Sequence, residues 1–358
     1  MRVLFTTGDA YLPQLAGGAQ SSTHQLALKL ISHGHDVAVL CKLYGGDWTG
    51  LKARVNKRLA GNQFARDKAM GYPVFRAWAP AATSEVTRRF KPDVAVVQNG
   101  DTITIASSLQ ADGVPVVLYF RNVEFDELGG NPASLLQARY ISNSNFTASC
   151  YERAFGVTST VIPPLIDRSF YSTTSTRENV TFINPYPVKG VDLVVGIARL
   201  CPEIPFVFQE SWSLNETYKA ELAAQIERLA NVALRPRTKD MKSVYGKARI
   251  VLAPSKWEEA WGRVASEAHC SGIPVIGSRR GGLPEAIGEG GIVLDYDAPL
   301  EDWADAVRQL WTDEAEYQRV SAATRKFSER SEMNPEHQFA TFFSVLQQAA
   351  ESQSLVTS

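Results

Sequence analysis

The chain has 358 residues, of which 44% are hydrophobic and 10% aromatic, enough apolar material for two buried cores, so intrinsic disorder is excluded. The formal net charge of −1 gives no overall attraction to nucleic acid or to an anionic membrane, so an anion site must be local.

The four cysteines (Cys41, Cys150, Cys201 and Cys270) are scattered and form no Cys-x-x-Cys pair, which predicts free, mostly buried thiols in a reducing compartment. The first residues run directly into a strand pattern and lack the zones of a signal peptide. No apolar run approaches the roughly 20 residues needed to span a bilayer. We therefore expect a cytoplasmic protein, or at most one that lies on a membrane surface.

Short β-rich runs alternate with helical stretches in the first half of the chain, which is typical of parallel sheets covered by helices. Strands are predicted at residues 3–7, 36–41, 74–77, 94–98, 114–120 and 140–142, with an amphipathic helix at 21–33. The pattern predicts a Rossmann-like, doubly wound domain over residues 1–162.

One local excess of positive charge interrupts this half. It consists of Lys52, Arg54, Lys57, Arg58, Arg66 and Lys68, with Asp67 as the one acid among them. The cluster fits either a solvated helical face or a contact with an anionic acceptor or membrane surface, which would make the protein peripheral to a membrane.

A second series of strands is predicted at residues 159–162, 180–184, 205–209, 232–235, 250–253, 274–278 and 291–294, with helices at 189–200, 215–229, 241–247, 264–271 and 301–311. The rigid Pro163-Pro164 pair indicates an interdomain connection, so the second Rossmann-like domain covers residues 163–335. Two such α/β domains face each other across a cleft at the carboxyl ends of their strands. A last helix, within 336–358, has one face formed by Phe339, Phe342, Phe343 and Leu346.

The segment from Glu259 to Glu267 is the most informative part of the sequence. A loop turns into a helix at Gly262, where the missing side chain lets backbone approach a ligand closely. Unpaired N–H groups at the start of that helix would favour an anion. The pattern predicts a diphosphate cradle with a carboxylate on either side for sugar and ribose hydroxyls.

These residues resemble glycosyltransferase family 4, of the GT-B fold, whose Glu-x7-Glu motif matches Glu259 and Glu267. Three flanking segments match as well: Pro254-Ser255, Gly272-Ile273-Pro274-Val275 and Gly281-Gly282-Leu283-Pro284-Glu285. The resemblance covers nearly the whole chain and is most specific over residues 244–294. It implies a retaining transferase that uses a nucleotide-diphosphate sugar, and a C-terminal helix that returns to the first domain.

The resemblance also assigns roles in donor binding. Glu259 would hold the donor sugar and act in catalysis, and Glu267 would hold the ribose. The backbone amides that would meet the sugar and phosphates belong to Ala260, Trp261, Gly262, Arg263 and Val264.

Lys189, before Gly190 at the start of the predicted helix 189–200, can neutralise the diphosphate as the glycosidic bond breaks. Relatives pair this lysine with an arginine about five residues earlier, where this chain has Asn184-Pro185. Arg263 or Arg237 would then compensate.

In the first domain, Gly17 and Gly18 would present bare amides to the donor. Arg121 replaces the family's histidine and is a candidate catalytic or acceptor-binding residue, together with Asn122 and Glu124. His24 and His269 are interpreted as packed, structural histidines.

No metal is expected, since no Asp-x-Asp dipeptide follows a strand and no His or Cys cluster is present. The nucleotide sugar is the co-substrate, and the acceptor is a glycan, a lipid-linked sugar or a small molecule. Three alternatives remain: a phosphorylase of the same fold, a non-catalytic nucleotide-sugar-binding subunit, and a nicotinamide dehydrogenase. The last is disfavoured because the first loop lacks the G-x-G-x-x-G spacing.

Overall fold

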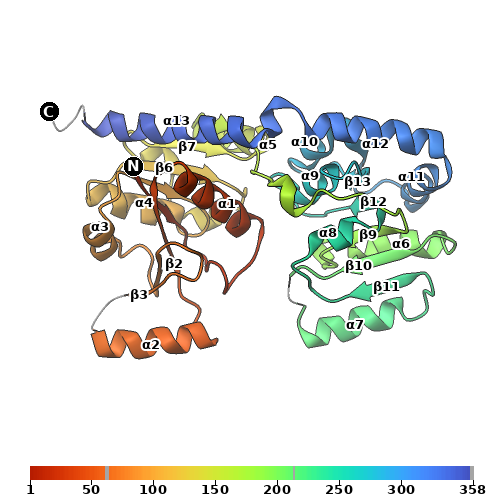
Figure 1. Ribbon diagram of the computed structural model, residues 1–358, viewed down its shortest axis with the longest axis horizontal. Helices are drawn as coiled ribbons and strands as arrows, with labels where there is room; N and C mark the ends of the chain where they lie inside the picture. Colours follow the sequence, from red (N-terminus) through yellow and green to blue (C-terminus); the bar gives the residue numbers. More distant parts are fainter. Residues whose placement is uncertain (61–63, 213, 355–358) are drawn as a thin grey trace. The chain divides into compact units, whose positions relative to one another are not determined.

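A computed structural model describes residues 1–60, 64–212 and 214–354, which belong to two compact units (Figure 1). Unit 1 comprises Met1–Leu165 together with Pro335–Ser358, and unit 2 comprises Ile166–Asn334. The boundaries predicted at 162/163 and 335/336 lie close to these, although Pro163-Pro164 is part of unit 1 and the connection follows it.

Unit 1 contains an eight-stranded sheet in the order β3-β4-β2-β1-β5-β6-β7-β8. The strands are β1 (Arg2–Thr6), β2 (Asp36–Lys42), β3 (Phe64–Asp67), β4 (Val74–Ala77), β5 (Val94–Val97), β6 (Val116–Phe120), β7 (Arg139–Ser142) and β8 (Thr160–Val161). Among the strands that the structure describes in this sheet, only β3 runs antiparallel to its neighbour. The strand order reverses between β1 and β5, which is where ligands bind in doubly wound sheets.

The helices of unit 1 cover this sheet or its edge. They are α1 (Gly18–Ser32), α2 (Trp48–Ala60), α3 (Ser84–Phe90), α4 (Thr102–Ala111), α5 (Asn145–Phe155) and α13 (Pro335–Ser354), with short 3-10 turns η1 (Phe125–Leu128) and η2 (Pro132–Ser134). Strands such as β5 are buried along their whole length, as expected for parallel strands covered on both faces.

The predicted strand 159–162 belongs to unit 1 and does not start the second series. β8 pairs in parallel with β7, with Ile141 opposite Thr160 and Ser142 opposite Val161. The two prolines that follow, with no N–H to donate, end this strand.

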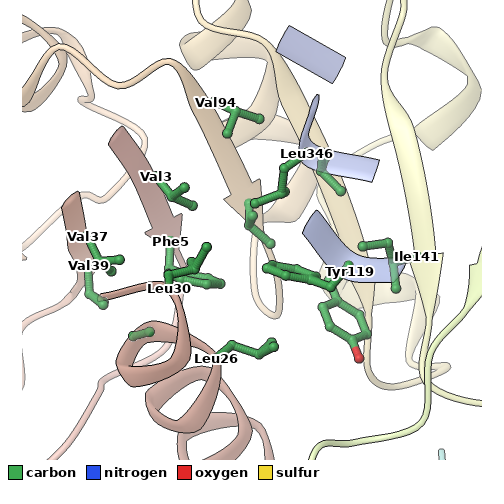
Figure 2. Close-up of a cluster of buried hydrophobic side chains, with 14 of the residues drawn as sticks. Val3, Phe5, Leu26, Leu30, Val37, Val39, Val94, Tyr119, Ile141 and Leu346 are labelled. Carbon is green, nitrogen blue, oxygen red and sulfur yellow. The ribbon is translucent and has the colours of Figure 1, made fainter. Parts of the chain in front are cut away.

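The C-terminal helix α13 completes the core of unit 1, as the resemblance implied. Phe339, Phe342 and Leu346 are buried against the sheet and α1, and Phe342 stacks on Phe5 with ring centroids 6.2 Å apart. Figure 2 shows Leu346 among side chains of β1, β5 and β6.

Unit 2 contains a six-stranded, entirely parallel sheet in the order β11-β10-β9-β12-β13-β14. The strands are β9 (Asn179–Ile183), β10 (Phe206–Gln209), β11 (Val232–Arg235), β12 (Ala248–Ala253), β13 (Val275–Ser278) and β14 (Gly291–Leu294). A second Rossmann-like domain is therefore confirmed.

The helices of unit 2 flank this sheet. They are η3 (Arg168–Phe170), η4 (Pro187–Lys189), α6 (Val191–Leu200), α7 (Glu216–Ile226), α8 (Met241–Tyr245), α9 (Arg263–His269), α10 (Leu283–Ile287), η5 (Gly288–Gly290), α11 (Leu300–Thr312), α12 (Glu314–Ser328) and η6 (Ser331–Met333). Trp303 of α11 is fully buried in a core shared with α6, β9 and β10.

All four cysteines are free thiols. Among the residues that the structure describes, no helix combines the length and the apolar character that crossing a bilayer requires.

Candidate functional site

Lys189 lies at the carboxyl edge of the unit 2 sheet, in the connection that follows β9. The prediction that it opens the first helix of this domain is wrong: Lys189 ends the 3-10 helix η4, and α6 begins only at Val191. Pro187 starts η4 and Gly190 separates it from α6, so the lysine stands in a short connector and not on the long helix.

The side chains of Lys189 and Glu259 meet at this edge. Lys189 Nζ donates to Glu259 Oε1 at 2.5 Å, and the two side chains are 17% and 21% exposed. The backbone N–H groups of Lys256 and Trp257 donate to the carbonyl of Val188 at 3.0 and 3.1 Å. These bonds tie η4 to the loop that carries Glu259, so the charged pair is built on two anchored segments.

Two glycines let the loop of Glu259 pack closely against its surroundings. Gly262 has a φ of 100°, and a Cβ there would stand 2.5 Å from Cδ1 of Leu283. At Gly281, φ is 59° and a Cβ would stand 2.2 Å from the carbonyl oxygen of Glu259. Side chains at either position would displace this loop, because the backbone is left-handed and the space is filled.

Glu267 is a buried residue of α9, the helix that follows this loop, and 9% of the residue is exposed. Its Oε2 accepts from the Tyr245 hydroxyl at 2.9 Å, and its Oε1 pairs with Arg263 Nε at 3.3 Å. Burial raises the pKa of Glu267, and the Arg263 guanidinium opposes that rise. Tyr245, which the sequence did not single out, is therefore a fixed donor to this carboxylate.

Asn184 directly follows β9, near the position where the resemblance led us to expect an arginine. It adopts a left-handed backbone with φ 69°, and its Oδ1 accepts from the backbone N–H of Trp212 at 2.9 Å. The Trp212 ring lies 5.1 Å from Lys189 Nζ, within the range of a cation–π contact. Tyr186 packs on Trp212 with ring centroids 5.5 Å apart. Lys189 therefore contacts an aromatic ring as well as the Glu259 carboxylate.

The remaining candidate residues of unit 2 differ in whether their side chains are exposed or held by other residues. The Trp261 indole is buried and donates to Ser266 Oγ at 2.9 Å, which leaves its backbone as the part that could meet a ligand. Arg263 is held by Glu267, whereas Arg237 is exposed after β11. His269 is buried, in agreement with its interpretation as a structural residue.

The candidates of unit 1 lie at the carboxyl end of its own sheet. Gly17 is the N-cap of α1, which begins at Gly18 and not at Ser21 as predicted. Arg121 directly follows β6, is buried, and stacks its guanidinium 3.9 Å from the centroid of the Tyr119 ring.

Asn122 and Glu124 follow Arg121 in the same connection. Asn122 Nδ2 donates to Glu127 Oε2 at 3.4 Å. Burial raises the pKa of Glu124, and the nearby Glu127 adds to that rise. Asn122 and Glu124 therefore both lie near Glu127.

His24 is a packed residue, as predicted. Its Nδ1 shares a hydrogen bond of 2.7 Å with the Tyr72 hydroxyl, which in turn bonds the hydroxyl of Tyr11 at 2.7 Å. Burial lowers the pKa of His24, whose half-buried ring stands at the end of this chain of hydrogen-bonded side chains.

Comparison with known curated proteins gives partial matches. The chain is 43% identical over 93 residues to the D-inositol 3-phosphate glycosyltransferase of Corynebacterium diphtheriae, which covers 25% of this chain and 21% of that protein. It is 31% identical over 96 residues to spore coat protein SA of Bacillus subtilis, which covers 26% and 25% of the two chains. The matched segments therefore span only about a fifth to a quarter of these relatives' length.

Solved structures match over nearly the full chain. A glycosyltransferase from Rickettsia africae superposes with a TM-score of 0.76 at 13% identity, covering 97% of this chain and 98% of that one. HepE of Anabaena, in complex with UDP-glucose, superposes with a TM-score of 0.71 at 17% identity, covering 99% of both. At these identities the likeness establishes the fold.

Two family models match the chain in succession. The model described as Glycosyltransferase Family 4 matches residues 16–170, and that described as Glycosyl transferases group 1 matches residues 184–327. Since these matches together extend over most of both units and the fold agrees, the chain belongs to glycosyltransferase family 4, with the GT-B fold.

Proposed function

We propose that the protein is a retaining, metal-independent glycosyltransferase that moves a sugar from a nucleotide-diphosphate donor to a hydroxyl acceptor. The observation that carries the proposal is the pairing of Lys189 with Glu259 at the carboxyl ends of β9 and β12. It sets one cation and one carboxylate side by side at the edge where doubly wound sheets bind ligands. The UDP-glucose bound to HepE belongs to a protein of this fold and supports a donor of the same chemical class.

The two members of the ion pair bind different parts of the donor: Lys189 binds the diphosphate, and Glu259 binds the sugar. A diphosphate carries more negative charge than one carboxylate and attracts the Lys189 ammonium away from Glu259. The released carboxylate then accepts hydrogen bonds from hydroxyls of the donor sugar. Glu267, which already has Tyr245 and Arg263 as donors, keeps a fixed orientation for the ribose hydroxyls.

The chemical step requires no nucleophile from the protein. The bond between the anomeric carbon and the phosphate oxygen breaks, and the acceptor oxygen bonds to that carbon on the same face. Because the acceptor attacks the face that the phosphate leaves, the configuration at the anomeric carbon is retained. The leaving phosphate oxygen takes the acceptor's proton, so charge and protons balance. Lys189 stabilises the negative charge that develops on the diphosphate, which is electrostatic catalysis by a positioned group.

Metal independence is part of the proposal. Lys189 supplies positive charge at the diphosphate, and the described residues contain no group of three or more His, Cys, Asp or Glu that could hold a metal ion. Full activity in the presence of a chelator is expected, and activity that depends on added Mg²⁺ would contradict this part.

The acceptor is proposed to meet unit 1 through Arg121, Asn122 and Glu124. Arg121 suits a phosphate or carboxylate on the acceptor, since a guanidinium binds such groups in two-point contacts. The matched relatives are named for D-inositol 3-phosphate, which makes phosphorylated polyols one class to test beside glycans and lipid-linked sugars.

The test is nucleotide binding by Lys189→Ala, measured as a thermal shift with UDP, ADP, GDP and their sugar conjugates. Ligands that bind the folded chain raise its melting temperature by mass action. The variant is expected to bind the preferred nucleotide about tenfold more weakly or worse, because a charged hydrogen bond is lost. Lys247→Ala is the matched control, since Lys247 is an exposed lysine of unit 2 that pairs only loosely with Glu178.

Two results would overturn the proposal: a parent protein that binds none of these nucleotides, or a Lys189→Ala protein that binds them as tightly as the parent. A phosphorylase is distinguished by turnover with inorganic phosphate in place of the nucleoside diphosphate. A non-catalytic subunit is distinguished by donor binding without transfer to any acceptor in the panel.

A further inference from the structure

Helix α2 exposes large apolar side chains on one stripe. Trp48 is 77% exposed, and Leu51 and Val55 are each 50% exposed. Positions separated by three and four residues lie on the same face of an α-helix, so the three side chains form a continuous strip. In Figure 1 the helix lies beside β3, away from the helices that cover the sheet of unit 1.

The opposite face of α2 contacts the protein through two small residues, Ala53 and Gly50. Ala53 is buried, and the backbone of Gly50 approaches so closely that a Cβ there would stand 2.3 Å from the carbonyl oxygen of Tyr44. The Arg54 guanidinium lies 5.6 Å from the ring of Trp78. The orientation is therefore fixed by contacts, and the helix turns its apolar strip outward, the reverse of an ordinary surface helix.

Positive charge flanks the apolar strip on both sides. Lys52 and Arg58 are exposed, and at 100° per residue they fall on either side of the line through Trp48, Leu51 and Val55. The sequence of α2 contains no Asp or Glu. The side chain of Lys57 lies outside the described residues.

The other members of the basic cluster do not belong to this face. Arg66 is on β3, 5.7 Å from the ring of Phe75, and Lys68 follows that strand. The interpretation of the six residues as one helical face is therefore wrong for these two.

We propose that α2 binds an anionic lipid bilayer, with Trp48, Leu51 and Val55 entering the interface and Lys52 and Arg58 contacting lipid phosphates. An outward apolar strip bordered by cations matches the interfacial region of such a bilayer in both polarity and charge. Pairing of this strip with the same strip of a second copy is disfavoured, because two surfaces that carry cations and no acid would face each other. The inference goes beyond sugar transfer and does not depend on it.

Vesicle flotation with the full chain tests the proposal. We expect binding to vesicles of phosphatidylcholine mixed with phosphatidylglycerol at low salt, and little binding to pure phosphatidylcholine. High salt should weaken the binding, because screening removes the attraction of the cations. Quenching of tryptophan fluorescence by brominated lipid should occur in the parent and be lost in Trp48→Phe.

Two sets of variants separate the apolar and the charged contributions. Lys52→Ala and Arg58→Ala should each weaken binding to the anionic vesicles by about fivefold. The double variant Trp48→Ser, Leu51→Ser should weaken it by about tenfold or more. Leu136→Ser is the matched control, because Leu136 is an 81% exposed apolar residue of unit 1 outside α2, and its change should leave binding as in the parent.

All of these side chains are exposed, so the variants should have the same melting temperature as the parent. If the apolar variant misfolds, vesicle binding by the charge variants still tests the proposal. The proposal is overturned if the parent does not bind the anionic vesicles at low salt. It is also overturned if the Trp48→Ser, Leu51→Ser protein binds like the parent. A parent dimer that this variant converts to a monomer, with vesicle binding unchanged, would show that the strip pairs two copies instead.

Discussion

Asn184 combines a rare backbone conformation with a hydrogen bond that supports the candidate site. Its φ of 69° is tolerated by asparagine better than by most residues with a Cβ. Its side chain accepts from the Trp212 backbone, and Trp212 flanks Lys189. Asn184 is therefore linked to the lysine indirectly, through Trp212 in the loop after β10.

We predict that Asn184→Ala lowers the free energy of unfolding of unit 2 by about 2 kcal/mol, of which about half is the lost hydrogen bond and half the left-handed backbone. Asn184→Gly should lose only the first part, because glycine adopts this backbone without strain. Denaturant unfolding, monitored by hydrogen exchange of amides in unit 2, measures the free energy of unfolding of both variants. Equal losses for the two variants would show that the backbone conformation contributes nothing.

Sequence reasoning found the charged residues of the site more readily than their neighbours. Glu259 and Glu267 were identified from the loop-to-helix pattern and the resemblance, and the structure places Glu259 against Lys189. Tyr245 and Trp212 were not assigned these contacts, because each reaches its partner across a loop whose course no periodicity determines. Tyr245 ends α8 and Trp212 lies in the loop after β10, and neither position carries a sequence signal of which side chain the ring will meet.

At the scale of elements, α9 holds His269 in a buried, neutral state. Burial, aided by the positive charge of Arg330, lowers its pKa to about 3, against an ordinary value near 6.5. Between these two values the unfolded chain binds a proton that the folded chain does not. Acidification through this range therefore favours the unfolded state.

We predict that unit 2 loses stability as the pH falls from about 6.5 toward 3, with a contribution from His269 of about 2 kcal/mol at about pH 5. Chemical unfolding at a series of pH values measures the slope. His269→Gln should reduce that slope, although the variant itself starts less stable. The raised pKa of Glu267 has the opposite effect on the pH dependence of stability. Because Glu267 is present in both proteins, its contribution cancels when their pH profiles are compared. Parallel pH profiles for parent and variant would contradict the prediction.

The elements themselves were predicted unevenly. β4, β11 and β14 have the predicted bounds, because each is a short apolar run between turns. α12 was missed although Asp313 caps it by accepting from the Glu316 N–H, a signal that the sequence carries as Asp-x-x-Glu. The bounds of α2 and the edge strand β3 were not predicted, since their residues do not show the inward apolar pattern on which such predictions depend.

At the scale of the whole molecule, each unit has its own hydrophobic clusters, and α13 belongs to those of unit 1. Phe342 is fully buried, stacked on Phe5 and close to Tyr119. The sheet of unit 1 is therefore covered by a helix that the chain supplies only after it has formed all of unit 2.

We predict that Phe342→Ala destabilises unit 1 by about 3–5 kcal/mol, the cost of a cavity left by a buried aromatic ring. The transition of unit 2, followed by the exchange of amides around the buried Trp303, should be unchanged. Phe170→Ala, at an exposed aromatic residue, is the control and should affect neither transition. Loss of protection in both units together would show that they unfold as one.

The interrupted course of unit 1 has a consequence for synthesis on the ribosome. Residues 166–334 are continuous and emerge together, so unit 2 can fold as soon as they leave the exit tunnel. Unit 1 has all its strands earlier, yet the part of the β1, β5 and β6 face that α13 covers beside α1 stays exposed until residues 335–354 are translated. During that interval we expect the nascent chain to expose apolar surface of the kind that favours aggregation, until docking of α13 buries it.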